Sequence, residues 1–196
     1  MILTDGMLLY HGSYITVSEI DLSKCNEGLD FGKGFYVTSS YKQAISFVPN
    51  SVKRNIRTKV IPEDFNVDDG QVSVYKVHLN PALHIETFPD AGKDWLHFVA
   101  ANRNKSLFPD LYQQFANVDI VGGKIANDNT ARTLNAYVTG LYGTPGNETV
   151  DNFTILSLLP NRLEDQYCFR TETATMSLEF IRSDRYGDIK HLLASE

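Results

Sequence analysis

The strongest constraint on the fold is a segment in which apolar and polar side chains alternate. Residues 72–79 read VSVYKVHL, and a period of two is typical of a strand with one buried face. Segments at residues 35–38, 118–125 and 166–170 have the aromatic and β-branched content of strands. Residues 7–10 form a short apolar run, which we expect to be a buried strand that ends at the polar His-Gly-Ser. The chain is therefore expected to contain a sheet.

Helical patterns separate these strands. Residues 41–48 are expected to form a helix that Ser39 or Ser40 caps and Pro49 ends, and residues 50–70 are expected to form a polar surface loop. Further helices are expected at residues 94–102, 127–142, 150–159 and 173–181. Because strands and helices mix without a regular βαβ rhythm, the predicted fold class is α+β.

The composition is that of one folded domain, which we expect to span residues 1–196. Hydrophobic residues make up 42% of the 196 and charged residues 21%, which suits a packed core and argues against disorder. The net charge of -6 at pH 7 does not fit the broad basic surface of a duplex-binding module, but it leaves room for a local positive groove that binds one anionic ligand. This charge favours a small-molecule or protein substrate.

Cysteine and histidine positions predict neither a disulfide framework nor a metal site. Cys25 and Cys168 are far apart and lack CxxC spacing, and the five histidines show no ligand spacing. The N-terminus lacks a basic start followed by a long apolar run, and no stretch approaches the ~20 apolar residues of a membrane span. We therefore expect a cytoplasmic protein without membrane contact.

Two glycine-containing motifs carry residue types that bind ligands. In Tyr10-His11-Gly12-Ser13, glycine permits close approach to the backbone, while histidine and serine offer hydrogen bonds. Taken alone, this tetrapeptide also fits an ordinary turn. The second motif, residues 28–36, reads GLDFGKGFY, and alone it also fits a flexible loop that leads into a core strand. GxGxxG is absent, so no Rossmann site is predicted.

Together, the two motifs resemble the poly(ADP-ribose)-polymerase and diphtheria-toxin branch of the ADP-ribosyltransferases. The signature of that branch is His, Tyr and Glu on three separate strands. The resemblance implies NAD as co-substrate, with His11 on the adenosine-ribose hydroxyl and Gly12 holding the nicotinamide amide through its backbone. Ser13 would support that amide, and Tyr36 would stack on the nicotinamide ring.

The same resemblance implies a fold and two further contacts. The fold is a split pair of small antiparallel sheets with peripheral helices, and NAD binds in the cleft between the sheets. Gly34 is among the implied NAD-binding residues. Phe47 is the nearest match, one residue out of step, to a second aromatic that closes the other face of the nicotinamide ring.

The third strand departs from the family pattern, because its Glu position falls on Gln166 in the run LEDQYCF. In the family, the glutamate holds a ribose hydroxyl and its charge stabilises an oxocarbenium-like state. A glutamine keeps the hydrogen bond and loses the charge. Glu164 would point to the same side of the strand and restore the charge, and Glu172 is a weaker candidate. An ordinary strand-edge polar residue is the alternative interpretation of Gln166.

A longer resemblance covers nearly the whole chain. Residues 95–103 and 118–128 resemble runs of an uncharacterised bacterial family of the same clan, a domain of unknown function in which Gln also stands at the Glu position. Within these runs, Asn127 and Asp128 are expected to cap a helix rather than to touch substrate. Trp95 is expected to lie in the core.

Three other polar residues leave alternatives open. Asn102 and Arg103 either reach a pyrophosphate, for which arginine presents a suitable fork, or belong to a surface salt bridge, which we favour. Lys33 either approaches the phosphates or is solvated, and we favour solvation.

The function predicted from the resemblance is transfer of ADP-ribose from NAD to a nucleophile, with release of nicotinamide. The acceptor is a protein side chain or a nucleic-acid base, and the sequence does not distinguish them. Small bacterial proteins of this clan suggest an intracellular toxin that an antitoxin partner restrains. Two alternatives remain open: an NAD glycohydrolase, in which water is the acceptor, and a catalytically inactive reader of NAD or ADP-ribose, which the missing glutamate favours.

Overall fold

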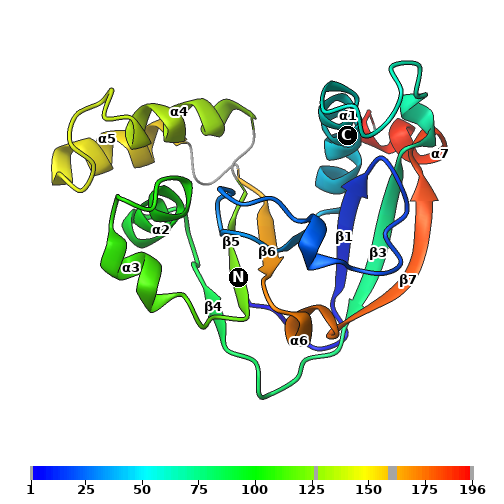
Figure 1. Cartoon of the computed structure of the whole chain (residues 1–196), viewed down its shortest axis with the longest axis horizontal. Helices are drawn as coiled ribbons and strands as arrows, with labels where there is room; N and C mark the ends of the chain where they lie inside the picture. Colours follow the sequence, from blue (N-terminus) through cyan, green and yellow to red (C-terminus); the bar gives the residue numbers. More distant parts are fainter. Residues whose placement is uncertain (1, 126–127, 159–162, 195–196) are drawn as a thin grey trace. The chain divides into compact units, whose positions relative to one another are not determined.

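The computed structural model describes residues 2–125, 128–158 and 163–194 (Figure 1). Its contacts divide the chain into two compact units. The β1 unit, named after its strand β1 (Leu8–Ser13), consists of Thr4–Asp21, Tyr36–Asn80 and Met176–Glu196. The β6 unit, named after its strand β6 (Asp165–Phe169), consists of Met1–Leu3, Leu22–Phe35 and Pro81–Thr175. Both units contain strands and helices, so the α+β class is confirmed.

The described strands of the β1 unit have the order β2-β1-β3-β7. Strand β1 lies between β2 (Phe35–Thr38) and β3 (Gln71–Val77) and is antiparallel to both. Its register with β3 extends over the whole of β1. Strand β7 (Leu178–Arg185) pairs antiparallel with the other edge of β3. The central strands of this unit are thus β1 and β3.

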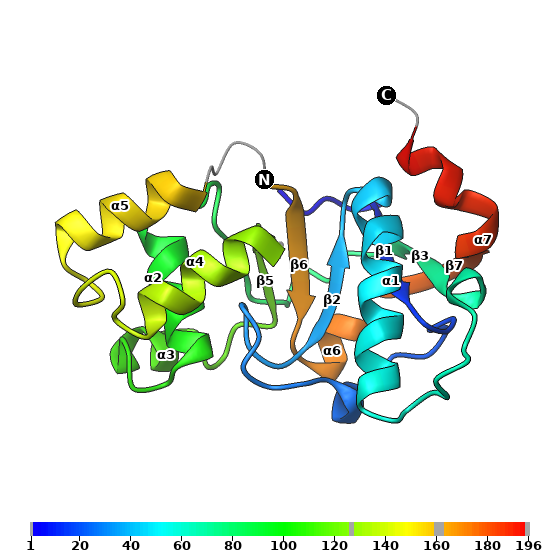
Figure 2. The same ribbon diagram turned by 90° about the horizontal axis from the view of Figure 1, so that it is seen from above.

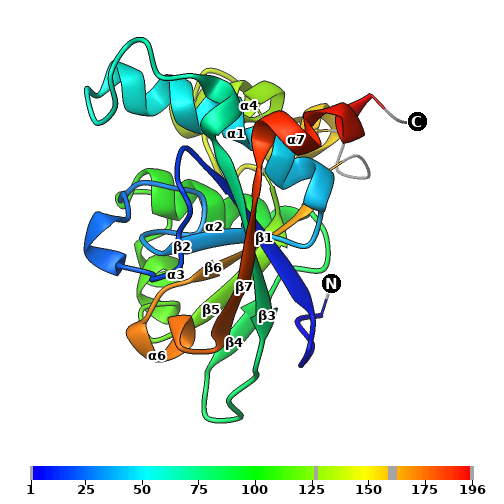
Figure 3. The ribbon, with the colours of Figure 1, turned by 90° about the vertical axis from the view of Figure 1, so that its right-hand side faces the viewer.

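Helix α1 (Tyr41–Arg57) packs on one face of these strands (Figure 2). The hydroxyl of Ser40 caps its first turn by accepting a hydrogen bond from the backbone N–H of Gln43. Helix α7 (Tyr186–Ile189) and the 3₁₀ turn Lys190–Leu193 lie beside α1 (Figure 3). The apolar side of α1 and the strand β3 form a buried cluster of Ala44, Ile45, Val48, Val52 and Val72.

In the β6 unit, β4 (Ile85–Thr87) is parallel to β5 (Ile120–Lys124), which is antiparallel to β6. Helix α2 (Lys93–Arg103) contacts the three helices α3, α4 and α5 (Figure 1). Its Trp95 is buried, as predicted, and donates from Nε1 to the carbonyl of Lys124 at 3.1 Å. The remaining helices are α3 (Pro109–Gln114), α4 (Asp128–Val138), α5 (Glu148–Leu158) and α6 (Glu172–Thr175). Within the described stretches, none of the helices has the length and apolar content that crossing a bilayer requires.

Helix α1 corrects the prediction that Pro49 ends the first helix. The helix continues to Arg57, so a surface loop over residues 50–70 is wrong for its first part. A proline inside a helix costs about 3 kcal/mol, because it removes a hydrogen bond and crowds the preceding turn. Val48 and Val52 are buried on either side of the proline. Packing against the sheet therefore outweighs the local preference.

Two strand boundaries also differ from the prediction. Strand β1 continues through residues 11–13, because its register with β3 extends to Ser13. Residues 178–181 form the start of β7 rather than the end of a helix, because Leu178 pairs with Val77. In both places a partner strand that is distant in sequence decides the structure, and local periodicity does not reveal that partner.

The other predicted elements agree with the structure, apart from their ends. Strand β2 has the predicted bounds. The bounds of β3, β5, β6, α2 and α5 differ from the predicted ones by one or two residues at each end. Helix α4 begins at Asp128 and ends at Val138, short of the predicted residue 142. Asn127, an expected cap of this helix, lies outside the described residues. The sequence did not predict β4, α3 or α7.

A buried carboxylate joins three helices of the β6 unit. Asp151 of α5 accepts hydrogen bonds from His97 Nε2 of α2 at 2.7 Å and from the Tyr137 hydroxyl of α4 at 2.6 Å. The backbone N–H of Gly146 donates to the same carboxylate at 3.1 Å. Burial raises the pKa of Asp151, but the hydrogen bonds from Tyr137 and His97 outweigh it, and the pKa lies below its usual value. The carboxylate is therefore charged at neutral pH and holds the helices together.

Replacement of Asp151 tests this network. Asp151→Ala should lower the free energy of unfolding by about 3 kcal/mol, because each buried donor left unpaired costs ~1–3 kcal/mol. Urea unfolding followed by circular dichroism measures the change. Asn152→Ala, at an exposed position of the same helix, should shift stability by no more than about 0.5 kcal/mol. If both variants unfold at the same urea concentration, the network contributes nothing.

Candidate functional site

Strands β1 and β2 bring the two sequence motifs together. His11 lies on β1 and Tyr36 on β2, 25 residues apart in sequence. The Nδ1 atom of His11 lies 2.7 Å from the carbonyl oxygen of Tyr36. Because a carbonyl oxygen only accepts, Nδ1 carries the hydrogen, and Nε2 of the neutral ring is an acceptor. The contact therefore determines which nitrogen of His11 can receive a hydrogen bond from a hydroxyl.

The register of β1 determines where the backbone of Gly12 points. At the start of the ladder, the backbone N–H of Val77 donates to the carbonyl of Met7 at 2.9 Å. Hydrogen-bonded and non-hydrogen-bonded pairs alternate along antiparallel strands. The backbone groups of His11 and Ser13 therefore face β3, whereas those of Gly12 face the β2 side.

Strands β1 and β2 part beyond their pairing at Tyr10 and Thr38. Regular continuation would pair Gly12 with Tyr36 and direct the Gly12 N–H to the Tyr36 carbonyl. In the described structure, the ring of His11 takes that carbonyl, and the register of β1 with β2 does not include Gly12. The peptide groups of Gly12 are thus directed at the point where the strands diverge.

Glycine at position 12 also has a packing role. A Cβ there would overlap the carbonyl oxygen of Ala44 in α1 and would lie 3.3 Å from the side chain of Val48. Any side chain would push α1 away from β1. The close approach of helix and strand therefore requires glycine, whatever ligand binds.

A loop of the β1 unit lies on the face of the sheet that carries His11. The backbone N–H of Val17 donates to Ser73 Oγ at 3.0 Å, and the Tyr75 hydroxyl donates to the Val17 carbonyl. Ser73 pairs with His11 in register, so their side chains share a face. The loop and its strand partner therefore surround part of the imidazole.

These surroundings keep His11 neutral. Although the ring keeps some exposed surface, burial lowers the pKa of His11 to about 4. The hydrogen bond to the Tyr36 carbonyl acts in the opposite direction, and the positive charge of Arg54 acts with burial. At physiological pH, His11 is thus a neutral ring with a defined acceptor.

The other predicted residues of the β1 unit differ in exposure. Ser13 is buried at the end of β1 and lies on the same face as His11. Tyr36 is half-buried on β2. Phe47 lies on α1 with 36% of its surface exposed, away from the buried side of the helix. The β1 unit thus brings His11, Gly12 and Tyr36 together.

Gln166 is a buried residue of β6 in the other unit. It pairs with Gly123 of β5, so both residues face the same side of the ladder. That side is closely packed, since a Cβ at Gly123 would lie 2.5 Å from Phe31 and 3.0 Å from Trp95. Nevertheless, Nε2 of Gln166 has no hydrogen-bond partner among the described residues. A buried amide donor without a partner is costly, which makes Gln166 a candidate to bind a ligand.

Gly34 allows close packing against β6. A Cβ at this position would lie 2.5 Å from Cys168 Sγ and 2.7 Å from the carbonyl oxygen of Phe169. The segment that leads into β2 can therefore lie against β6 only without a side chain at residue 34. This packing explains the glycine within the β6 unit.

The two glutamates considered for the third catalytic position are exposed. Glu164 precedes β6, and its carbonyl accepts a hydrogen bond from the Ile125 N–H at 2.8 Å, which extends the ladder by one pair. Glu164 therefore lies on the same face of the strand as Gln166. Glu172 is the first residue of α6.

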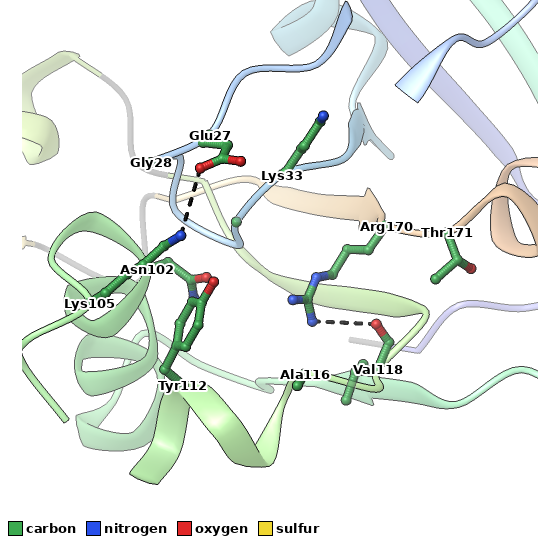
Figure 4. A pocket seen from close by; sticks show the side chains of 11 residues that line it. Glu27, Gly28, Lys33, Asn102, Lys105, Tyr112, Ala116, Val118, Arg170 and Thr171 are labelled. Carbon is green, nitrogen blue, oxygen red and sulfur yellow. Dashed lines mark hydrogen bonds and ion pairs between the residues drawn. The ribbon is translucent and has the colours of Figure 1, made fainter. Parts of the chain in front are cut away.

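A pocket at the end of β6 is an additional feature that the sequence did not predict. It has a volume of about 240 Å³ and lies entirely within the β6 unit (Figure 4). Its lining includes Glu27, Gly32, Lys105, Tyr112, Arg170 and Thr171. These residues come from separate segments of the chain, so no local motif indicates the pocket.

Lys33, Asn102 and Arg103, for which the sequence left open contact with phosphates, lie in or beside this pocket. Lys33 and Asn102 line it. Arg103 instead forms an ion pair with Asp30 at 2.6 Å, and only 15% and 13% of these side chains is exposed. The expected salt bridge of Arg103 is therefore present, but it is largely buried rather than on the surface.

The family model described as "Protein of unknown function (DUF3990)" matches residues 7–180. The chain belongs to this family. The matched region includes His11, Tyr36, Gln166 and the pocket at the end of β6. No curated protein matches the chain, and no solved structure does. Membership of a family of unknown function agrees with that part of the second resemblance, whereas the relation to the ADP-ribosyltransferases and the enzymatic activity remain predictions.

The neutral state of His11 predicts a pH dependence. The folded protein holds the ring neutral down to about pH 4, whereas the unfolded chain protonates it near pH 6.5. The unfolded state therefore binds more protons between these values, and the native state should lose about 3 kcal/mol as pH falls from 6.5 to 4. Urea unfolding at several pH values measures this loss, and His11→Gln should lack that part of it. A His11 proton resonance that titrates near pH 6.5 would contradict the assignment.

Proposed function

We propose that this chain is an NAD-dependent ADP-ribosyltransferase. In the proposed reaction, the bond between ribose C1′ and the nicotinamide nitrogen breaks, and its electron pair leaves with nicotinamide. A nucleophile of a protein or nucleic acid then forms a bond to C1′ and gives up its proton. The resemblance of the two sequence motifs and the geometry around His11 support this proposal.

The observation that carries the proposal is the hydrogen bond between His11 and the Tyr36 carbonyl. It makes Nε2 of His11 an acceptor, which suits a ribose hydroxyl. The register of β1 with β2 stops at Tyr10 and Thr38, short of Gly12. The N–H and C=O of Gly12 then match a carboxamide such as that of nicotinamide, which both donates and accepts. Tyr36 supplies an aromatic ring on the neighbouring strand for stacking.

Gln166 has the third role in this proposal. Its buried Nε2 is a donor without a described partner, and a ribose hydroxyl can accept its hydrogen bond. The neutral amide does not stabilise the positive charge that develops at C1′. Loss of one such electrostatic contact slows comparable reactions by ~10²–10³-fold, so the expected enzyme is slow. Glu164, on the same face of the strand, is the alternative source of negative charge.

The neutral Gln166 favours a second candidate function, a catalytically inactive module that binds NAD or ADP-ribose. An NAD glycohydrolase is a third possibility, and it differs from the transferase only in using water as the acceptor. Consumption of NAD or modification of a macromolecule would suit the toxin of a toxin–antitoxin pair. Release of nicotinamide separates both enzymes from the inactive module, and transfer of labelled ADP-ribose to a macromolecule separates the transferase from the hydrolase.

Calorimetry of NAD binding tests the site in the β1 unit. Tyr36→Ala should weaken NAD binding about fivefold or more, because aromatic stacking contributes roughly 1 kcal/mol beyond the buried area. His11→Ala should also weaken binding, because it removes the acceptor Nε2. His78→Ala is the matched control, since His78 is an exposed histidine of the same unit. Unchanged NAD affinity in folded Tyr36→Ala and His11→Ala proteins would rule out this site.

Replacement of Gln166 tests the third position by separating stability from activity. Gln166→Met keeps the length of the side chain and removes the buried amide, whose Nε2 has no partner among the described residues, so unfolding free energy should stay equal or rise. The rate of nicotinamide release should nevertheless fall about 10²-fold, as for loss of one transition-state contact. Gln166→Glu should match or exceed the wild-type rate. If Gln166→Met retains full activity and Glu164→Ala abolishes it, Glu164 holds the third position.

A further inference from the structure

The pocket at the end of β6 has a positive lining in an acidic chain. Lys33, Lys105 and Arg170 line it together with one carboxylate, that of Glu27, whereas the chain as a whole carries a net charge of -6. Positive groups around a concave surface raise the local concentration of anions. Positive side chains therefore outnumber negative ones in this lining, whereas negative ones outnumber positive ones in the whole chain, and the lining suits an anionic ligand.

Arg170 is held by backbone oxygens rather than by a carboxylate. Its Nη1 donates to the carbonyl of Phe115 at 2.6 Å and to that of Val118 at 3.3 Å. The contact with Val118 is drawn in Figure 4. Its Nη2 lies 3.8 Å from the point that a Cβ of Gly32 would occupy, so this edge of the guanidinium lies along the loop that lines the pocket. Carbonyl oxygens orient the guanidinium, and the nearby Asp119 carboxylate interacts with its charge without forming an ion pair to it among the described residues. The positive charge of Arg170 is thus fixed at the pocket.

Lys105 is only weakly neutralised. Its Nζ lies 3.7 Å from a carboxylate oxygen of Glu27, and 59% and 72% of these side chains is exposed. Exposed pairs of this kind contribute little, because water and salt screen them. The neighbouring pair of Arg103 and Asp30 is shorter and largely buried. Arg103 is therefore paired with a buried carboxylate, whereas Lys105 of the pocket remains accessible to a ligand.

We propose that this pocket binds the phosphate group of a small ligand. Arg170 and Lys105 supply charge-assisted hydrogen bonds, and Gly32, with φ +82°, allows the ligand to approach the backbone. The ring of Tyr112 forms a flat wall, with the Lys105 ammonium 5.4 Å from its centre. Since a water takes up ~30 Å³, a cavity of about 240 Å³ has room for a phosphate and part of the group attached to it.

This site does not rest on the proposed NAD chemistry. Its residues belong to the β6 unit, whereas His11 and Tyr36 belong to the β1 unit. The NAD proposal also uses Gln166 of the β6 unit, but Gln166 does not line the pocket, so binding at the two sites can be tested separately. His11→Ala should weaken NAD binding and leave phosphate binding unchanged.

Amide NMR titrations with inorganic phosphate and with ribose 5-phosphate test the proposal. Both ligands should shift the amides of Gly32, Lys105 and Thr171 in a saturable way, and tighter binding of ribose 5-phosphate would identify a phosphate ester as the ligand. Lys105→Ala should weaken binding about tenfold, because it removes a charge-assisted contact. Arg170→Lys should weaken it similarly, because it keeps the charge but removes the oriented guanidinium fork. Higher salt should weaken binding further.

Arg132→Ala is the matched control, because Arg132 is an exposed cation of the same unit outside the pocket. It should bind phosphate as the wild type does. Lys105→Ala keeps the test valid if Arg170→Lys fails to fold, since Lys105 is exposed and bonds no backbone carbonyl. Absence of saturable shifts, equal weakening in Arg132→Ala, or binding of acetate as tight as that of phosphate would overturn the proposal.

Discussion

The hydrogen bond between the ring of His11 and the carbonyl of Tyr36 governs the arrangement of the β1 unit around its candidate site. It lies where the register of β1 with β2, which includes Tyr10 and Thr38, does not extend to Gly12. Burial and this contact together give His11 one protonation state and one tautomer. The side chain of His11 thus binds a backbone carbonyl of β2 at the end of the β1–β2 pairing.

Glycines in this chain show why a motif alone does not establish a site. Gly12 and Gly34 both belong to the sequence pattern that resembles NAD-binding proteins. Each also has a packing reason, because α1 meets β1 at Gly12 and the chain lies against β6 at Gly34. Packing and ligand binding make the same demand on the residue, namely the absence of a side chain. The glycines are consequently weaker evidence for function than His11, whose side chain also presents an acceptor nitrogen.

Local patterns predicted the fold where a segment's own residues decide its structure. The bounds of β2 and the position of Trp95 in the core followed from residue type and spacing. The prediction failed at Pro49, where packing of α1 outweighs a local preference, and at β7, which depends on pairing with β3. The candidate site was predictable in part, because the His-Gly-Ser and Gly-Phe-Tyr runs are local motifs. The pocket at the end of β6 was not, since Lys33, Lys105 and Arg170 come together only in the folded chain.

Gln166 connects stability with function most directly. A protein selected for stability alone would place an apolar residue at this buried position, because an amide without a partner reduces stability. Residues that reduce stability in this way persist where they bind a ligand, since the ligand supplies the missing partner. Because Nε2 of Gln166 has no hydrogen-bond partner among the described residues, there is a physical reason to expect a polar partner at β6 that does not depend on resemblance to any family. The resemblance adds only which ligand to test first, and a polar ligand at Gln166 would remain expected if NAD failed to bind.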